Sequence, residues 1–161
     1  MNIYEFAMKM EMDGEAYYRE LASKTKIPAL QKILGMLADD EVAHYNIVKR
    51  IRENLPAELA ETKVLTNAKN IFAQLKDQEN DFNLDGSEVG LYKKAVEIEN
   101  KSENFYKEKA GETETPEAKE LLLKIAAQER NHGLLVENMI VFLLRPQLWV
   151  ENGEFNHLDQ Y

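Results

Sequence analysis

Two stretches of the chain decide how it folds: ADDEVAH at residues 38–44 and AAQERNH at residues 126–132. Each stretch contains a glutamate followed three residues later by a histidine. Residues three apart lie on the same face of a helix, so each stretch can present a carboxylate and an imidazole in one direction. A single pair with this spacing is common by chance. Two such pairs, 88 residues apart, indicate that one structural unit occurs twice in the chain.

The similarity between the two halves extends over most of a helical hairpin. A shift of 88 residues aligns residues 7–44 with residues 95–132 without a gap, and 12 of these 38 positions are identical. Shared helix-forming composition does not readily supply a proline, a glutamate and a histidine in register. We therefore predict two copies of one helical hairpin joined by a long crossover, as in ferritin-like four-helix bundles. The identical pairs are Ala7/Ala95, Glu11/Glu99, Glu15/Glu103, Tyr18/Tyr106, Glu20/Glu108, Ala22/Ala110, Thr25/Thr113, Pro28/Pro116, Leu34/Leu122, Ala38/Ala126, Glu41/Glu129 and His44/His132.

Four long segments have the spacing of apolar residues that is typical of helices, and glycine and proline are scarce. We expect an all-α bundle domain over residues 1–145, with a crossover at about 55–86 that contains a short helix at about 68–76. Residues 146–161 are expected to form a tail that packs on the bundle or at an oligomer interface. The four helices are expected from about Asn2 to Lys24, from Pro28 to about Asn54, from a Ser87 cap to about Gly111, and from a Thr115 cap through Pro116 to just before Pro146.

Each of the four helices places a glutamate on its apolar face. On a helical wheel of about 100° per residue, this glutamate falls among apolar side chains. His44 and His132 lie on the same helix faces as Glu41 and Glu129, respectively. At 1.5 Å per residue, each glutamate lies ~20 Å from the turn of its hairpin, so all four are expected at one level. The expected sets are Glu11 with Ile3, Ala7, Gly14, Tyr18 and Leu21; Glu41 and His44 with Leu30, Leu34, Leu37, Val48 and Leu55; Glu99 with Leu91, Ala95 and Tyr106; and Glu129 and His132 with Leu122, Ile125, Val136, Ile140 and Leu143.

Four carboxylates inside an apolar core require neutralisation. One buried carboxylate is already costly, and four also repel one another. The apolar arcs contain no lysine or arginine at this level, whereas two divalent cations would balance the four negative charges. Carboxylates and imidazoles form a ligand set suited to iron or manganese, with zinc as a further candidate. One glutamate from each of two helices and Glu-x-x-His from each of the others is the di-iron carboxylate pattern, so we predict two iron ions.

The composition excludes several other classes of function. The net charge of −9 disfavours nucleic acid as a partner, because phosphate backbones attract basic surfaces. Cysteine is absent, which excludes disulfides, thiolate nucleophiles, iron–sulfur clusters and zinc–thiolate sites. The N-terminus lacks the pattern of a signal peptide, and the most apolar stretch, residues 134–144, is too short for a membrane span of ~20 residues. We expect a cytoplasmic protein with no nucleic-acid or membrane partner.

The sequence resembles the rubrerythrin branch of the ferritin-like superfamily over about residues 1–145. The resemblance rests on the two Glu-x-x-His pairs, on Glu11 seven residues before Tyr18, and on Glu99 seven residues before Tyr106. By this resemblance, the six ligand side chains divide between two iron ions, and two tyrosines hold ligand carboxylates in place. The implied roles are Glu41 and Glu129 as bridges, Glu11 and Glu99 as terminal ligands, His44 and His132 as ligands of one ion each, and Tyr18 and Tyr106 as partners of the carboxylates.

The chain departs from founding-type rubrerythrins in two ways. Those proteins carry a rubredoxin domain with four cysteines, whereas this chain has no cysteine. They also have a further glutamate three residues after the terminal glutamate of the third helix, where this chain has Ser102. The resemblance implies a peroxidase or ferroxidase that reduces hydrogen peroxide or dioxygen. Its electrons would come from a separate, rubredoxin-like donor protein.

Other functions stay open at this point. The main alternative is an iron-binding protein that sequesters or delivers iron without turnover. Substrate hydroxylation and manganese catalase activity are further uses of similar bundles, because one fold supports many functions. Relatives commonly form dimers, and the connection of about 32 residues is long enough for a hairpin to swap between chains. We therefore expect a homodimer.

Overall fold

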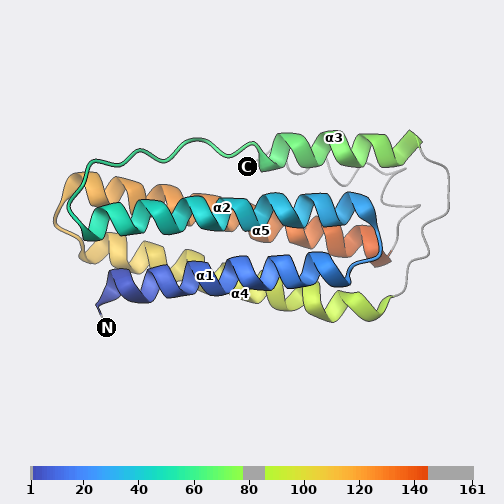
Figure 1. Ribbon diagram of the computed structural model, residues 1–161, viewed down its shortest axis with the longest axis horizontal. Helices are drawn as coiled ribbons and strands as arrows, with labels where there is room; N and C mark the ends of the chain where they lie inside the picture. Colours follow the sequence, from blue (N-terminus) through green and yellow to red (C-terminus); the bar gives the residue numbers. More distant parts are fainter. Residues whose placement is uncertain (1, 78–85, 145–161) are drawn as a thin grey trace.

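The computed structural model describes residues 2–77 and 86–144, and these residues are mostly helical. Four long helices form a bundle, and a shorter helix lies beside it (Figure 1). The two described stretches contain no strand, so the expected all-α ferritin-like bundle is confirmed. None of their helices is long and apolar enough to cross a membrane. The elements are α1 (Ile3–Lys24), α2 (Pro28–Arg52), α3 (Val64–Asp77), the 3₁₀ turn η1 (Gly86–Glu88), α4 (Val89–Glu112) and α5 (Pro116–Leu144).

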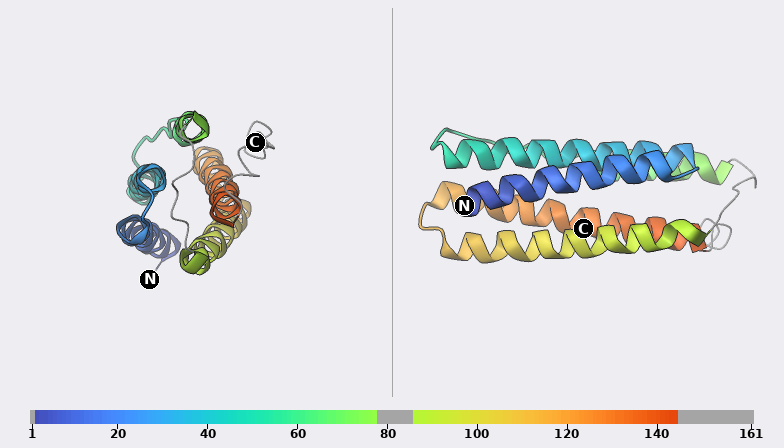
Figure 2. Two further views of the ribbon diagram at one scale, coloured as in Figure 1. Left: turned by 90° about the vertical axis from the view of Figure 1, so that its right-hand side faces the viewer. Right: turned by 60° about the horizontal axis from the view of Figure 1, so that its bottom comes forward.

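The bundle consists of two antiparallel helical hairpins packed side by side. α1 and α2 form the first hairpin and α4 and α5 form the second, with the two hairpin turns at opposite ends of the bundle (Figure 1). After α2, residues 53–63 run back along the outside of the bundle, and α3 then packs against α2. In the end view, α3 lies outside the four long helices (Figure 2). Its buried side chains, including Phe72, nevertheless join the apolar core of the four long helices.

Local sequence accounts for both ends of the first hairpin. Asn2 caps α1 by accepting a hydrogen bond from the backbone N–H of Glu5 (2.8 Å). α2 ends two residues earlier than expected, because Asn54 adopts a left-handed conformation with φ of 56°. The N–H of Leu55 then bonds back to the carbonyl of Arg50 (2.9 Å), which closes the helix.

The start of α4 differs from the prediction that Ser87 caps it. The turn η1 precedes the helix, and Glu88 occupies the capping position without making a side-chain cap bond. Glu88 is buried, and its carboxylate instead accepts a hydrogen bond from the Thr25 hydroxyl (3.1 Å). The Thr25 hydroxyl in turn accepts a hydrogen bond from the Tyr92 hydroxyl (2.9 Å). Contacts with Thr25 of the first hairpin thus hold the first residues of α4.

The short helix in the crossover is longer than the prediction. α3 begins at Val64, four residues before the expected start. Thr62 is the reason, because its hydroxyl oxygen accepts a hydrogen bond from the N–H of Val64 (3.2 Å) and donates to Asp40 on α2 (2.5 Å). The crossover is thereby fastened to the bundle just before α3. The predicted tail, residues 146–161, lies outside the described residues.

The apolar core is divided into two clusters by a polar layer at mid-height. One cluster surrounds Leu34 on the side of the α1–α2 turn, and the other surrounds Leu122 on the side of the α4–α5 turn. The prediction that Ile3 and Leu55 belong to the core is wrong, since Ile3 is 36% exposed and Leu55 is 45% exposed. Ile3 lies in the first turn of α1, and Leu55 follows the residue that ends α2, so neither reaches the interior.

Candidate metal centre

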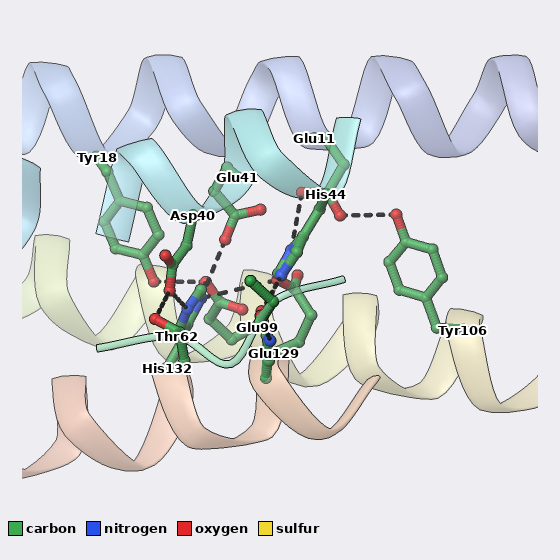
Figure 3. A network of polar contacts seen from close by, with 12 residues as sticks. Glu11, Tyr18, Asp40, Glu41, His44, Thr62, Glu99, Tyr106, Glu129 and His132 are labelled. Atoms are coloured by element: carbon green, nitrogen blue, oxygen red, sulfur yellow. Dashed lines mark hydrogen bonds and ion pairs between the residues drawn. The ribbon is translucent and has the colours of Figure 1, made fainter. Parts of the chain in front are cut away.

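The polar layer between the two apolar clusters contains the six predicted ligand side chains, brought together by the four long helices (Figure 3). All six are buried, with exposed fractions of 3% or less. Their donor atoms form two groups of four, and within each group these atoms all lie within 4.8 Å of one another. The first group is Glu11, Glu41, His44 and Glu129, and the second is Glu41, Glu99, Glu129 and His132.

Both histidines direct their Nδ1 atoms into the cluster. His44 Nδ1 lies 2.8 Å from Glu129 Oε1, and His132 Nδ1 lies 3.2 Å from Glu41 Oε1. Each Nδ1 is also 3.5 Å from the unshared glutamate of its own group. The two rings stack with their centroids 5.8 Å apart. Each half of the cluster therefore combines one imidazole, one glutamate of its own and two shared glutamates.

Four buried atoms of the cluster that could bind a metal ion have no hydrogen-bond partner in the described part of the chain. They are Glu11 Oε2, His44 Nδ1, Glu99 Oε2 and Glu129 Oε1. His44 Nδ1 and Glu129 Oε1 approach to 2.8 Å without the geometry of a hydrogen bond. An unpaired buried polar atom costs about 1–3 kcal/mol, and coordination of a common ion would offset that cost. The nitrogen and oxygen donors of this cluster thus fit divalent cations such as iron, manganese and zinc.

The buried carboxylates of the cluster strongly shift one another's pKa values. Burial, together with repulsion from the neighbouring carboxylates, raises the pKa of Glu41 well above its usual 4.5. Burial and repulsion also raise the pKa of Glu129 to about 8, although the charge of His44 opposes the rise. Burial acts in the same direction on Glu11, but hydrogen bonding with Glu41 and the charge of His44 outweigh it, and the pKa of Glu11 is lowered. The raised pKa values favour the protonated form of the two shared glutamates, so an incoming cation competes with protons for them.

The pKa values of both histidines are also raised. Burial lowers the pKa of His44, but the charges of Glu11 and Glu129 outweigh burial and raise this pKa well above 6.5. Burial is likewise outweighed at His132, where the charge of Glu99 is the largest opposing effect and the pKa rises to about 10. Protons and divalent cations are thus alternative ways to neutralise the same buried negative charge.

Two buried tyrosines connect the hairpins at the cluster. The Tyr18 hydroxyl on α1 donates to Glu99 Oε1 on α4 (2.6 Å), and the Tyr106 hydroxyl on α4 donates to Glu11 Oε1 on α1 (2.6 Å). Burial, reinforced by the nearby carboxylates, raises the pKa of both tyrosines, so both remain protonated donors. Each unshared glutamate therefore has one oxygen held by a tyrosine of the other hairpin and one oxygen free to bind an ion (Figure 3).

Replacing Tyr106 with phenylalanine should weaken metal binding while leaving the fold intact. The substitution removes the hydroxyl that orients Glu11, and loss of a group that orients a ligand typically costs about 10–100-fold in metal affinity. Competition against a chelator with cobalt(II) as the probe measures this change. Tyr92→Phe is the matched control, because Tyr92 is also fully buried but bonds to Thr25 away from the cluster. Equal losses in the two variants would contradict the prediction.

Two further polar residues contact the cluster, and the sequence did not single them out. Asp40 Oδ2 lies 2.8 Å from His132 Nε2, and Gln128 Oε1 lies 2.7 Å from His44 Nε2. Each is one residue before a shared glutamate, and each contacts the histidine of the other hairpin. A signal was present, since positions 40 and 128 correspond in the internal repeat. Position 40 is an aspartate and position 128 is a glutamine, however, so the two are not among the identical pairs of the repeat.

A groove of about 500 Å³ lies between α1 and α4 beside the cluster. Gly14 separates this groove from Glu41, because a Cβ atom added to Gly14 would lie 3.3 Å from Glu41 Oε2. Ser102 lies one turn after Glu99 on the α4 side and is 4% exposed. Of the residues that line the groove, Gly14 therefore lies against a side chain of the cluster. Its lining is Phe6, Met10, Asp13, Gly14, Tyr17, Ile98, Lys101, Ser102 and Phe105.

Comparison with known proteins assigns most of the chain to a family. A family model described as Rubrerythrin matches residues 2–140, which include all four long helices up to the last turn of α5 and all six side chains of the cluster. Neither the search of curated proteins nor the search of solved structures gave a match.

Proposed function

Because the chain belongs to the rubrerythrin family, we propose that it is a di-iron oxidoreductase that reduces hydrogen peroxide or dioxygen. The observation that carries this proposal is the pair of buried donor groups that share two glutamates. Each group combines one imidazole and three carboxylates, and two adjacent ferrous ions held there would each be able to give one electron to a small oxidant.

The six side chains would divide between two metal ions according to the donor group to which each belongs. Glu41 and Glu129 belong to both groups, so we assign them as bridges between two ions. The other four side chains belong to one group each and would serve one ion each. When bound, two ferrous ions would supply the two electrons that convert one hydrogen peroxide and two protons into two waters. We assign iron, and not manganese or zinc, to both positions.

The chain's own contribution is to hold the ligands rigidly and to limit access of water. Tyr18 and Tyr106 hold the unshared glutamates from the opposite hairpin, so neither carboxylate can turn away from the cluster. Apolar clusters close the bundle above and below the polar layer. A small oxidant would reach the cluster from the α1–α4 groove beside Gly14, where the absence of a side chain leaves the least material between the groove and Glu41.

Stopped-flow mixing tests this proposal. Protein purified without added metal, then loaded anaerobically with ferrous iron, is mixed with hydrogen peroxide, and oxidation is followed by visible absorption. We expect oxidation at least about a hundredfold faster than that of the same concentration of free ferrous iron. A rate no faster than that of free iron would overturn the peroxidase proposal.

Electrons for repeated turnover would come from another protein. The chain contains no cysteine, so it has no rubredoxin-type iron site of its own. We propose a rubredoxin-like donor and a homodimer as the working form. Re-reduction of the oxidised protein by reduced rubredoxin tests the first point, and size-exclusion chromatography tests the second. A particle of about 24 chains would instead favour iron storage.

The groove supports a second candidate, the oxidation of a small organic molecule. Its volume of about 500 Å³ is far larger than peroxide needs and lies within the range of sites that bind small organic ligands. Most of its lining is apolar or aromatic, including Phe6, Met10, Ile98 and Phe105. An organic substrate seated there would lie beside the cluster.

Substitution of Ser102 with leucine distinguishes the two candidates. The larger side chain would occupy the part of the groove next to the cluster, where Ser102 is 4% exposed. We expect peroxide reduction to change less than about twofold, because peroxide needs little room, whereas oxidation of an organic substrate should fall by about tenfold or more. Product analysis by mass spectrometry measures the second activity. A large loss of peroxide reduction at unchanged metal content would contradict this expectation.

A further inference from the structure

The two histidines of the cluster are held from outside by different chemical groups. Asp40 on α2 contacts Nε2 of His132 on α5 (2.8 Å; Figure 3). Gln128 on α5 contacts Nε2 of His44 on α2 (2.7 Å). Positions 40 and 128 correspond in the internal repeat, so the two contacts are related by the symmetry of the bundle. One partner is a carboxylate and the other is a neutral amide.

The crossover fixes how Gln128 meets its histidine. The Gln128 amide nitrogen donates to the carbonyl of Ala60 (3.1 Å), so the amide oxygen must face His44. That oxygen can only accept, and His44 Nε2 therefore carries the proton of the hydrogen bond. His44 Nδ1, which points into the cluster, is then left free to bind an ion in the neutral imidazole.

The crossover also supports Asp40. Asp40 Oδ2 accepts hydrogen bonds from the hydroxyl of Thr62 (2.5 Å) and from His132 Nε2 (2.8 Å). A carboxylate that accepts from an imidazole N–H increases the electron density on the ring and makes its other nitrogen a stronger ligand. A neutral amide fixes the ring in the same way but gives much less of this increase. His132 should therefore bind its ion more strongly than His44 does.

We infer that the two metal positions are inequivalent, and that the position formed with His132 and Glu99 fills before the position formed with His44 and Glu11. This inference rests on the proposed two-metal site. The protein groups at the two positions otherwise match in type: each has one histidine, one glutamate held by a tyrosine of the other hairpin, and the two shared glutamates. At the outer side of the two histidines, the difference between Asp40 and Gln128 breaks this match.

Titration calorimetry of the full-length, metal-stripped protein with cobalt(II) tests the order of filling without any measurement of catalysis. We expect two binding steps whose affinities differ by about 10–100-fold. His132→Ala should remove the tighter step, and His44→Ala should remove the weaker one. Visible spectra of the cobalt-loaded variants report the change in coordination at each step.

Exchange of the outer partners tests the cause. Asp40→Asn should weaken the tighter step by about 10–100-fold, and Gln128→Glu should strengthen the weaker step. The double variant should reverse the order of filling. Asp39→Asn is the matched control, because Asp39 is the neighbouring residue on α2 and is exposed in an ion pair with Arg19. Thr62→Val, which removes only the support of Asp40, should weaken the tighter step less than Asp40→Asn does.

The outcomes separate the inference from the function on which it rests. Two steps of equal affinity, or loss of the weaker step in His132→Ala, would overturn the inferred order while leaving the two-metal site in place. Binding of one ion or none by the wild-type chain would overturn the two-metal site itself. Circular dichroism of each variant establishes that it is folded. If Asp40→Asn does not fold, the two histidine variants and Gln128→Glu still decide the order.

Discussion

Glu129→Gln is expected to abolish binding at both metal positions and to reduce the oxidation rate to that of free iron. Glu129 belongs to both donor groups, so its loss affects two ions at once. The amide keeps the size of the side chain but removes the negative charge and one ligand oxygen. Loss of a group that merely orients a ligand costs about 10–100-fold in affinity, and loss of a shared ligand should exceed that range.

Elemental analysis after gel filtration measures this effect directly, and we expect about two ions per wild-type chain and fewer than one per variant chain. Glu137→Gln is the control, because Glu137 is also on α5 but is exposed. The control should retain wild-type metal content and oxidation rate. Two tightly bound ions in Glu129→Gln would show that Glu129 is not a shared ligand.

The metal-stripped protein should become less stable as the pH rises from 6 to 10. His132 has a pKa of about 10 in the folded chain against 6.5 ordinarily, and Glu129 has about 8 against 4.5. A group whose pKa is raised on folding stabilises the fold below its ordinary pKa, and this stabilisation is lost as the pH rises through the folded value. The contribution of Glu129 is therefore lost from pH 4.5 to about 8 and that of His132 from pH 6.5 to about 10, so both decline between pH 6 and 10. Glu11, whose pKa is lowered, titrates below this window.

The expected effect is large. One pKa unit corresponds to about 1.4 kcal/mol, so a loss of about two units in this window lowers the free energy of unfolding by about 3 kcal/mol and the melting temperature by roughly 5–10 °C. Thermal melts in a chelator at several pH values measure this change. The metal-loaded protein should behave in the opposite way, because bound ions require deprotonated ligands and are held more tightly at higher pH. A melting temperature of the stripped protein that rises between pH 6 and 10 would contradict the prediction.

Glu129→Gln also provides the control for the pH effect. The amide cannot titrate, so the stripped variant should lose less stability than the stripped wild type as the pH rises from 6 to 10. At the higher pH values the variant should be the more stable of the two. The substitution that removes function would then stabilise the stripped fold, as expected where a site places buried charges for function and not for stability.

The sequence alone determined the class of fold and the membership of the cluster. Helical periodicity and prolines at helix starts are local properties, so they are visible in the chain itself. The repeat of residues 7–44 at residues 95–132 added the long-range information that two hairpins exist and correspond. Charge then completed the inference, because four glutamates on apolar faces require a common means of neutralisation.

Only the tertiary structure decided which group each member of the cluster contacts. Tyr18 donates to Glu99 and not to a glutamate of its own hairpin, and Asp40 contacts the histidine of the other hairpin. The partners in these contacts are more than 80 residues apart in the sequence. The periodicity of one helix specifies which face is buried, but it carries no information about which side chain of a facing helix lies opposite. That pairing depends on how the two hairpins pack, with their turns at opposite ends of the bundle, and this is a property of the assembled bundle alone.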